Sequence, residues 1–562
     1  MRTLREDPLA VRKARGAFFT PPAIADFLGR WAIRTPDARV LDPTCGEAVF
    51  LLAAAEQLQA LGAESSAVAA QLSGVDLHQP SLDASAALLH ELGAGANFVC
   101  SDFFELPTPA QIGDRVGWQD AVIGNPPFVR YQEHRGDARK RSVAAALAQG
   151  VRLSGLASSW AATLVHASAF LKPTGRLAMV LPAELLTVGY AEPIRRWLRK
   201  RFAVVNLVMF ERLQFHDADE NVVLLVAHGT GPCDSFCLFH VDDADDLAGI
   251  HPLDPIGANP AAEGKWSDLA LPLDVRQLFK VVAERMTRLD GYGTPELGTV
   301  TVANDYFALS EVTRKKYDLA EKHLKRISPP GTRHLKGLGF SRAQWEELRL
   351  RGERVWLLHP EKTAQSKGLA TYLEAGMKRG VPEAYKCTVR DPWWRPPVVP
   401  VPDLFFTYMS HRYPRLITNG AKTTLVNSMH GVRLKDDAPA EAREALPLLA
   451  LNSATMLGAE VMGRSYGGGI LKMEPREAAS LPVPGPGALV KAWRALSKQS
   501  LNLDATLRRG EWWGVVAEVD RVLLRGALGL NNDEVGAIRD AATLLRVRRT
   551  RKTEPHGSVD EA

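Results

Sequence analysis

The chain has 562 residues, of which 46% are hydrophobic and 24% charged, a composition typical of a folded protein and not of a disordered one. No apolar stretch approaches the roughly 18 residues that a membrane span needs, and the charged N-terminus lacks the apolar centre of a secretory signal. The five cysteines are scattered, which argues against a disulfide framework and suits a reducing compartment. Secreted and membrane proteins are thereby excluded, and we expect a cytoplasmic protein of two or three domains.

The net charge of +5 is unevenly distributed. Residues 321–435 hold 21 Lys and Arg against 9 Asp and Glu, a local charge of +12, so the rest of the chain carries −7. A basic block within a near-neutral protein suits a polyanionic partner, and a merely solvated charged surface has the same composition.

Residues 35–245 alternate short apolar runs with helical stretches. This alternation predicts an α/β fold with a doubly wound, mostly parallel sheet. The expected strands lie at 39–42, 73–76, 97–102, 120–124, 176–181, 204–208 and 222–227. Ligands of such sheets bind at the carboxyl ends of the strands, so Asp42, Asp76 and Asp102 are expected on that edge.

The character of the sequence changes after the acidic run at 241–246, where Pro, Gly, Trp and Arg become frequent. We therefore expect a first domain over 1–248 and a mixed second domain over 249–482. The Pro-Val-Pro-Gly-Pro-Gly stretch at 482–487 predicts a further boundary. A helical C-terminal segment, 483–562, then ends in a basic run and a polar tail.

The strongest local motif is Asn125-Pro-Pro-Phe128, directly after a predicted strand. Pro126 and Pro127 cannot continue a sheet and hold the backbone rigid, which fixes the Asn125 side chain at the strand end. A carboxamide oxygen is an acceptor that does not titrate, and it can draw on the N–H bonds of an exocyclic amino group. Phe128 offers a flat face for stacking of a planar base. A proline-rich turn without function is the alternative for the tetrapeptide alone.

The preceding strand ends supply a nucleoside-binding pattern. Asp42-Pro-Thr-Cys-Gly46 makes a tight turn into a helix, where a backbone approaches a ligand closely. Asp76 is placed to accept hydrogen bonds from ribose hydroxyls, and Ser101-Asp102-Phe103 offers a carboxylate and an aromatic ring to an adenine. The G-x-G-x-x-G pattern of nicotinamide enzymes is absent from the sequence.

With these motifs the sequence resembles the N6-adenine DNA methyltransferases of the gamma, TaqI-type or Eco57I-like group of restriction–modification systems. The resemblance rests on the catalytic motif at 125–128, on Gly16-Ala-Phe-Phe-Thr-Pro-Pro22 and on the three strand ends. It implies the class I fold of enzymes that depend on S-adenosylmethionine, with 249–482 as a target recognition domain. The implied cofactor-binding residues are Thr20, Pro21, Asp42, Thr44, Cys45, Gly46, Asp76, Leu77, Asp102 and Phe103.

The resemblance also implies a mechanism. An adenine cannot be reached inside duplex DNA and must be rotated out of the stack, and Phe128 and Phe215 would then sandwich it. Asn125 and the Pro126 carbonyl would accept the two amino hydrogens while the nitrogen attacks the methyl group. For Phe215, packing in the core is the alternative.

Three features depart from the family pattern. Ala48 stands near the place of a second loop glycine, Phe128 replaces a common tyrosine, and residues 132–158 form a long basic insert. The insert suits either a loop that closes on DNA or a surface insertion without a role.

Other classes remain open. RNA methyltransferases and protein glutamine methyltransferases share the Asn-Pro-Pro-Phe chemistry, but they usually lack a large basic domain after the catalytic one. A fused nuclease and a DNA-binding subunit without activity are also considered. We find no nuclease constellation and no metal-ligand spacing, so we expect a monomeric modification enzyme for double-stranded DNA, with a cognate restriction endonuclease as a possible partner and no metal.

Overall fold

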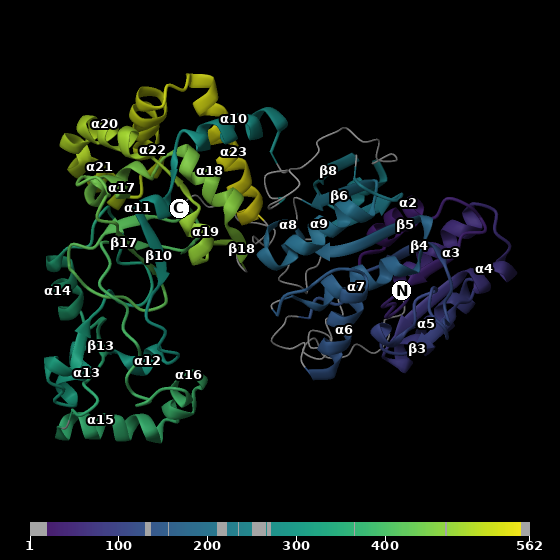
Figure 1. The fold of residues 1–562 in the computed structure, drawn as a ribbon, viewed down its shortest axis with the longest axis horizontal. Helices are drawn as coiled ribbons and strands as arrows, with labels where there is room; N and C mark the ends of the chain where they lie inside the picture. Colours follow the sequence, from purple (N-terminus) through teal and green to yellow (C-terminus); the bar gives the residue numbers. More distant parts are fainter. Residues whose placement is uncertain are drawn as a thin grey trace. The chain divides into compact units, whose positions relative to one another are not determined.

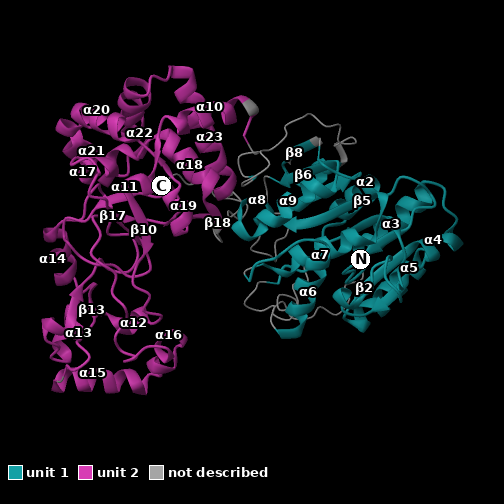
Figure 2. Ribbon diagram, in the orientation of Figure 1, with its two compact units in different colours: residues 1–270, 551–562 teal, residues 271–550 magenta. Residues whose placement is uncertain are grey.

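A computed structural model describes residues 20–129, 136–155, 157–210, 222–233, 235–249, 266, 271–364, 366–466 and 469–551. The chain forms two compact units, which Figure 2 colours separately. The first comprises residues 1–270 with 551–562, and the second comprises residues 271–550.

The first unit is built on one eight-stranded sheet, ordered β3-β2-β1-β4-β5-β7-β6-β8 (Figure 1). The strands are β1 (Val40–Asp42), β2 (Leu72–Asp76), β3 (Asn97–Cys100), β4 (Gln119–Gly124), β5 (Leu171–Pro182), β6 (Val204–Phe210), β7 (Val222–His228) and β8 (Ser235–Val241). Strands β3, β2, β1, β4 and β5 run parallel, whereas β7 is antiparallel to both of its neighbours. The predicted doubly wound, mostly parallel sheet is therefore confirmed.

Helices follow the strands in alternation. They are α2 (Pro22–Ala32), α3 (Val49–Ala60), α4 (Ser65–Gln71), α5 (Gln79–Glu91), α6 (Gly136–Ala148), α7 (Ser159–Ala167), α8 (Glu184–Thr187) and α9 (Glu192–Arg201), with a short 3-10 turn, η1 (Phe103–Glu105). Helix α2 packs on α3 and across β4 and β5, while α6 packs on α7 and η1. Because the central strands are covered, they read in sequence as nearly continuous apolar runs, such as Val222–His228.

The second unit holds several small sheets rather than one large one. Its strands are β9 (Thr287–Arg288), β10 (Gly293–Leu297), β11 (Ala308–Ser310), β12 (Leu324–Arg326), β13 (Arg354–Leu358), β14 (Leu404–Phe406), β15 (Met409–Ser410), β16 (Leu416–Thr418), β17 (His430–Leu434), β18 (Arg464–Tyr466), β19 (Ile470–Lys472) and β20 (Pro482–Val483). They pair as β10-β17-β14-β16, β11-β13-β12, β15-β19-β18 and β20-β9.

The helices of the second unit are mostly short. They are α10 (Leu273–Glu284), α11 (Leu289–Tyr292), α12 (Asn304–Phe307), α13 (Glu311–Lys316), α14 (Arg342–Leu350), α15 (Lys367–Lys378), α16 (Tyr385–Thr388), α17 (Ala442–Leu449), α18 (Ser453–Met462), α19 (Pro475–Ala479), α20 (Pro486–Leu496), α21 (Ser500–Arg508), α22 (Trp512–Asp520) and α23 (Asn532–Arg551).

The helices after residue 482 share a hydrophobic core with the elements before it. Leu489 of α20 and Ile538 of α23 belong to the same buried cluster as Leu446 of α17 and Leu457 of α18. The predicted division at 482 thus falls inside one compact unit. The separate role expected for each side of it remains a prediction.

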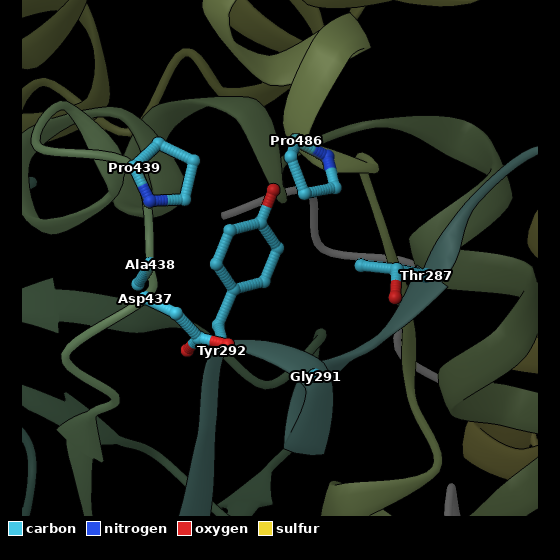
Figure 3. A pocket seen from close by; sticks show the side chains of 7 residues that line it. All are labelled: Thr287, Gly291, Tyr292, Asp437, Ala438, Pro439 and Pro486. Atoms are coloured by element: carbon cyan, nitrogen blue, oxygen red, sulfur yellow. The ribbon is translucent and has the colours of Figure 1, made fainter.

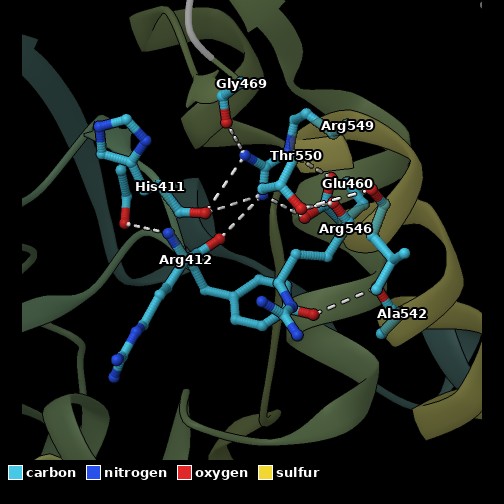
Figure 4. A network of polar contacts seen from close by, with 11 residues as sticks. His411, Arg412, Glu460, Gly469, Ala542, Arg546, Arg549 and Thr550 are labelled. Atoms are coloured by element: carbon cyan, nitrogen blue, oxygen red, sulfur yellow. Dashed lines mark hydrogen bonds and ion pairs between the residues drawn. The ribbon is translucent and has the colours of Figure 1, made fainter. Parts of the chain in front are cut away.

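A buried ion pair fixes the last helix to this unit (Figure 4). The Arg549 guanidinium contacts the Glu460 carboxylate at 2.7 Å and donates to the carbonyl oxygens of His411, Arg412 and Gly469. The Arg549 and Glu460 side chains are only 5% and 3% exposed. Arg549, which the sequence places in a basic tail, is therefore part of the core.

Within the described residues, no single helix is both long and apolar enough to cross a membrane. Helices α17 and α18 reach that composition only as a pair, with a bend of 79° between them.

Candidate functional site

The parallel strands β3, β2, β1 and β4 bring the predicted site residues to one edge of the sheet. Asp42 and Asp76 close β1 and β2, Asp102 follows β3, and Asn125 follows β4. Because β1 pairs in parallel with both β2 and β4, and β2 with β3, these four ends lie on the same side. The sequence prediction of a shared edge is met by the strand pairing.

The turn after β1 is held by backbone and side-chain hydrogen bonds. Thr44 N donates to Asp42 Oδ1 at 3.1 Å, and Cys45 N donates to Val75 O at 2.9 Å. Gly46 has a φ of +47°, and Ala48 has a φ of +59° at the start of α3. The loop therefore adopts a left-handed conformation at Ala48, where the resemblance expects glycine, although an L residue there costs about 1–2 kcal/mol.

Asp42 is fully buried at the base of this turn. Burial raises its pKa to about 8, because desolvation disfavours the carboxylate more than the hydrogen bond from Thr44 N favours it. Its Oδ2 has no hydrogen-bond donor among the described residues. Asp42 thus shapes the loop through Oδ1, while its Oδ2 has no partner among the described residues.

Asp76 is oriented by two backbone donors. Gly46 N donates to Oδ2 at 3.0 Å and His78 N donates to Oδ1 at 2.8 Å, so each carboxylate oxygen keeps one further lone pair. Neighbouring Leu77 is 71% exposed. This geometry suits a carboxylate that accepts from two adjacent hydroxyl groups.

Asp102 caps the short η1 turn. Its Oδ1 accepts from Phe104 N at 3.0 Å, and its Oδ2 accepts from Arg141 Nε at 2.9 Å. The Phe103 ring is buried, with its centroid 4.8 Å from the His166 ring and 5.4 Å from the Phe170 ring. Phe103 is thus held in a rigid aromatic cluster beside Asp102.

Asn125 is brought to Thr20, 105 positions earlier in the chain. Asn125 Nδ2 donates to Thr20 Oγ1 at 3.2 Å, and Thr44 Oγ1 donates to Asn125 O at 3.5 Å. Asn125 Oδ1 is buried, and no donor among the described residues reaches it. A buried acceptor without a partner costs about 1–3 kcal/mol, so its presence points to a ligand that supplies the missing donor.

The loop after Asn125 is fixed from the start of α7. Ser159 Oγ donates to Pro127 O and accepts from Val129 N at 2.9 Å, and Ser159 N donates to Val129 O at 3.1 Å. Phe128 is 8% exposed. These bonds fix the backbone directly before and directly after Phe128.

The structure unites the predicted residues at positions 20–128 in one region. Phe215 and residues 16–19 lie outside the described residues. Sequence reasoning missed Ser159, whose role appears only once α7 lies against the loop. It also missed Arg141, noted only as one of several cations in the insert.

The residues present fit a nucleoside cofactor beside an amino-bearing base. The strand-end carboxylates Asp76 and Asp102 are acceptors suited to ribose hydroxyls and to an exocyclic amino group. The unpaired Asn125 Oδ1 is a further acceptor close by. Within the described residues, no group of three or more His, Cys, Asp or Glu could hold a metal ion.

A cavity in the second unit is a poor alternative site (Figure 3). It encloses about 110 Å³ and is lined by Thr287, Gly291, Tyr292, Asp437, Ala438, Pro439 and Pro486. Small-molecule sites usually enclose about 300–1,000 Å³, so this cavity is too small for a nucleoside.

The second unit presents three exposed cations from separate chain segments: Arg326, Arg342 and Lys422. The Arg342 and Arg326 guanidinium carbons lie 4.6 and 5.9 Å from the centre of the Trp345 ring. Thr424 N donates to Arg326 O at 3.0 Å, and Ala421 N donates to Phe340 O at 2.8 Å, which draws the three segments together. We call these three residues the basic cluster.

The basic cluster lacks acidic partners among the ion pairs recorded for the described part of the chain. The nearest acids on α14 pair elsewhere, Glu346 with Arg349 and Glu347 with Arg351. The cluster is thus a concentration of positive charge that an anion from outside could neutralise.

Comparison with known families gives two matches that divide the chain. The N-6 DNA Methylase model matches residues 4–231, and the model of the C-terminal domain of Type II methyltransferase M.Eco57I matches residues 263–524.

Two relatives are Type II methyltransferases. M.XamI of Xanthomonas campestris pv. amaranthicola is 24% identical over 511 residues, 85% of this chain and 87% of that protein. M.BanIII of Aneurinibacillus aneurinilyticus is 25% identical over 222 residues, 36% of each chain. The similarity to M.XamI thus extends over both compact units.

A solved structure of similar fold is that of MmeI, a Type IIL restriction-modification enzyme in complex with DNA. It matches with a TM-score of 0.61 at 12% identity, covering 96% of this chain and 80% of that one. The likeness concerns the fold.

Proposed function

Since this chain belongs to the N6-adenine DNA methyltransferases of restriction–modification systems, we propose that it methylates N6 of an adenine in one recurring sequence of duplex DNA, with S-adenosylmethionine as the methyl donor. The family rests on the two models that between them match residues 4–231 and 263–524. The target base, the cofactor and the residue roles are the proposal.

The observation that carries the proposal is the buried Asn125 Oδ1 at the end of β4, which has no donor among the residues that the structure describes. Thr20 Oγ1 holds the amide nitrogen, so the oxygen is the atom left to accept. An exocyclic amino group supplies the missing donor, and the hydrogen bond keeps the nitrogen lone pair out of conjugation with the ring. The amino nitrogen then becomes nucleophilic without a general base.

Each neighbouring residue has a task in this reaction. Asp76 binds the ribose hydroxyls, Asp102 and Phe103 hold the adenine of the cofactor, and Thr44, Cys45 and Gly46 shape the loop beside its methionine part. Thr20 and Pro21 bring the N-terminal motif to Asn125. When bound, S-adenosylmethionine supplies an activated methyl group, so positioning of the two reactants contributes much of the rate.

The target adenine is flipped into the site and stacks on Phe128, with Phe215 as the second aromatic and the Pro126 carbonyl as the second acceptor. Ser159 supports this role because it fixes the backbone on both sides of Phe128. Rotation out of the duplex costs a few kcal/mol, which stacking and the two amino hydrogen bonds offset.

Duplex DNA is favoured over RNA or a protein glutamine as the substrate. The basic cluster is a surface for phosphate contacts, and residues 249–482, to which it belongs, act as the target recognition domain. M.XamI, similar along most of the chain, is named as a Type II methyltransferase. We expect a monomeric, cytoplasmic modification enzyme whose partner is a cognate restriction endonuclease.

The test is single-molecule sequencing of DNA from a methylation-free bacterial host that expresses the chain. The variant is Asn125→Ala, and the matched control is Asn502→Ala, because Asn502 is exposed on α21. We expect N6-methyladenine at one recurring motif with wild type and control, and none with Asn125→Ala.

Two results would contradict the proposal. Methylation that persists in Asn125→Ala would remove Asn125 from the reaction. Unmodified DNA from wild-type protein that binds the cofactor would exclude this substrate, and RNA and protein acceptors would then be assayed with radiolabelled S-adenosylmethionine.

A further inference from the structure

Helix α6, within the basic insert, reaches the carboxylate at the end of β3. Arg141 Nε and Nη2 both contact Asp102 Oδ2, at 2.9 and 2.8 Å. Arg141 also lies 3.3 Å from Glu105 Oε1. Helix α6 packs on η1, the turn that begins directly after Asp102. The insert is therefore attached to the proposed adenine site.

The contacts of Asp102 fix its orientation and leave acceptor capacity on its oxygens. Arg141 Nε donates to Oδ2 at 2.9 Å, Arg141 Nη2 lies 2.8 Å from the same oxygen as an ion pair, and Phe104 N takes one lone pair of Oδ1 at 3.0 Å. The Asp102 side chain is only 14% exposed, so it has little room to rotate. A lone pair of Oδ1 remains to accept a hydrogen bond from a ligand.

The neighbouring cation on the helix behaves differently. Lys140 pairs with Asp137 one turn away at 2.9 Å, and both side chains are about 80% exposed. Arg141 instead bridges to another element and is 38% exposed. Of these two adjacent cations, Arg141 therefore makes a contact with another element, whereas Lys140 forms a local pair on the surface.

We propose that Arg141 is a positioning residue that determines specificity for the cofactor. Through Arg141, the site selects a cofactor whose purine carries an amino group. The pair with Arg141 fixes the orientation of the Asp102 carboxylate, and a carboxylate only accepts hydrogen bonds. It favours the 6-amino group of adenine and repels the 6-carbonyl of hypoxanthine. Without Arg141, the Asp102 side chain can rotate away from the amino group, which weakens the preference for the amino compound. The inference rests on the proposed function, since it needs the cofactor adenine at Asp102.

The experiment compares two ligands that differ at one purine position. Calorimetry on the full chain measures the dissociation constants of S-adenosylhomocysteine and of its 6-oxo counterpart, S-inosylhomocysteine. The variants are Arg141→Gln, Arg141→Lys and the matched control Lys140→Gln, which loses the same charge from the same helix.

We expect wild type and Lys140→Gln to prefer the amino compound by about 100-fold, because the 6-oxo ligand leaves buried polar groups unpaired. Arg141→Gln should lower that ratio about tenfold, the contribution of a charge-assisted hydrogen bond. Arg141→Lys, which retains a charge but not the two-nitrogen contact, should lie in between. In an Asp102→Asn background, Arg141→Gln should leave the ratio unchanged.

A purely structural role for Arg141 would weaken both ligands equally and leave their ratio at the wild-type value, which would overturn the inference. So would a ratio that Asp102→Asn does not lower, because the amino group would then be read elsewhere. Failure of wild type to bind either ligand would contradict the proposed function itself, and the inference with it.

Discussion

In the first unit, the carboxylates at the sheet edge take their hydrogen bonds mainly from backbone N–H groups, whereas the buried carboxylates of the second unit pair with arginines. Asp76 accepts from two backbone nitrogens, and Asp42 accepts from one, with its Oδ2 unpaired among the described residues. Glu460 is bound by Arg549, and Asp520 is bound by Arg539 together with the backbone nitrogen and the hydroxyl group of Ser453.

We propose that this difference separates carboxylates that bind a ligand from carboxylates that stabilise the fold. An arginine contact uses up acceptor positions and neutralises the charge, which suits a structural pair. A backbone donor fixes the orientation and leaves lone pairs for a ligand. Asp102 has contacts of both kinds, one from Phe104 N and one from Arg141, and it lies where the insert meets the site.

The largest effect on stability is expected from removing the charge at Glu460. Glu460→Gln leaves the Arg549 guanidinium buried without its counter-ion, which should lower the free energy of unfolding by about 3 kcal/mol. Urea denaturation measures the loss. The affinity for S-adenosylhomocysteine should be unchanged, because Glu460 belongs to the other unit.

Glu347→Gln is the matched control, since its partner Arg351 is on the surface and both side chains are more than half exposed. Its cost should stay below about 0.5 kcal/mol. Equal losses in the two variants would remove the distinction between buried and exposed pairs.

At Asp42 in the first unit, we expect the Asp42→Asn variant to gain stability over wild type as the pH rises. The pKa of Asp42 is raised to about 8, so the folded chain keeps a proton there that the unfolded chain loses above about pH 4. Wild-type stability should therefore fall as pH rises from 4 towards 8, and Asp42→Asn should escape this loss. Between pH 6 and pH 8 we expect the stability of the variant to rise by about 2 kcal/mol relative to that of wild type.

Thermal unfolding at pH 5, 6, 7 and 8 measures this difference. Asp83→Asn is the control, because Asp83 is exposed on α5. A constant offset between Asp42→Asn and wild type across the four pH values would show that Asp42 is ionised in the folded protein.

A smaller effect, on the rate, should follow from freeing the Asn125 amide. Thr20→Val keeps the shape of the side chain but removes the acceptor for Asn125 Nδ2. The amide can then rotate and present Nδ2 in place of Oδ1 to the target amino group. We expect kcat for methylation to fall about tenfold, the value of one hydrogen bond, while the dissociation constant of S-adenosylhomocysteine stays constant.

Thr174→Val, at an exposed threonine of β5, should change neither quantity. A loss of cofactor affinity in Thr20→Val would assign Thr20 to the cofactor, as the family resemblance expects, and not to Asn125.

Much of the first unit could be predicted because its information is local. Most strands from β1 to β7 contain a short apolar run, although β5 begins at Leu171, before the run that the sequence shows, and the strand ends carry Asp42, Asp76 and Asn125 within the motifs themselves. The hydrogen bond from Asn125 to Thr20 could not be predicted, since 105 positions separate the two residues. Strand β8 (Ser235–Val241) was also missed, although it lies within the stretch of strand–helix alternation.

For the second unit, the sequence predicts a kind of partner from the composition but not the arrangement of the residues. Its excess of Lys and Arg over 321–435 indicates a polyanion, but the sequence does not say which cations gather. Arg326 and Lys422 are brought together by contacts between residues almost a hundred positions apart, such as that from Thr424 N to Arg326 O. Arg549 shows that composition can also mislead, because this residue of a basic run is buried in the core and does not lie on a charged surface.

The smallest single-residue effects are expected at the basic cluster, because its members are exposed and act through phosphates. Each of Arg326→Gln, Arg342→Gln and Lys422→Gln should weaken binding of a duplex about threefold at moderate salt, with the same factor for target and unrelated sequences. Each should also reduce the slope of log affinity against log salt by about 1. Fluorescence anisotropy of a labelled duplex across a salt series measures both quantities.

Lys378→Gln is the control, because Lys378 pairs with Glu374 at 2.8 Å and its loss should leave the slope unchanged. If the slope falls equally in the control, the duplex responds to the net charge of the unit and the basic cluster is not a local phosphate contact. A loss confined to the target sequence would instead assign the altered cation to a base edge.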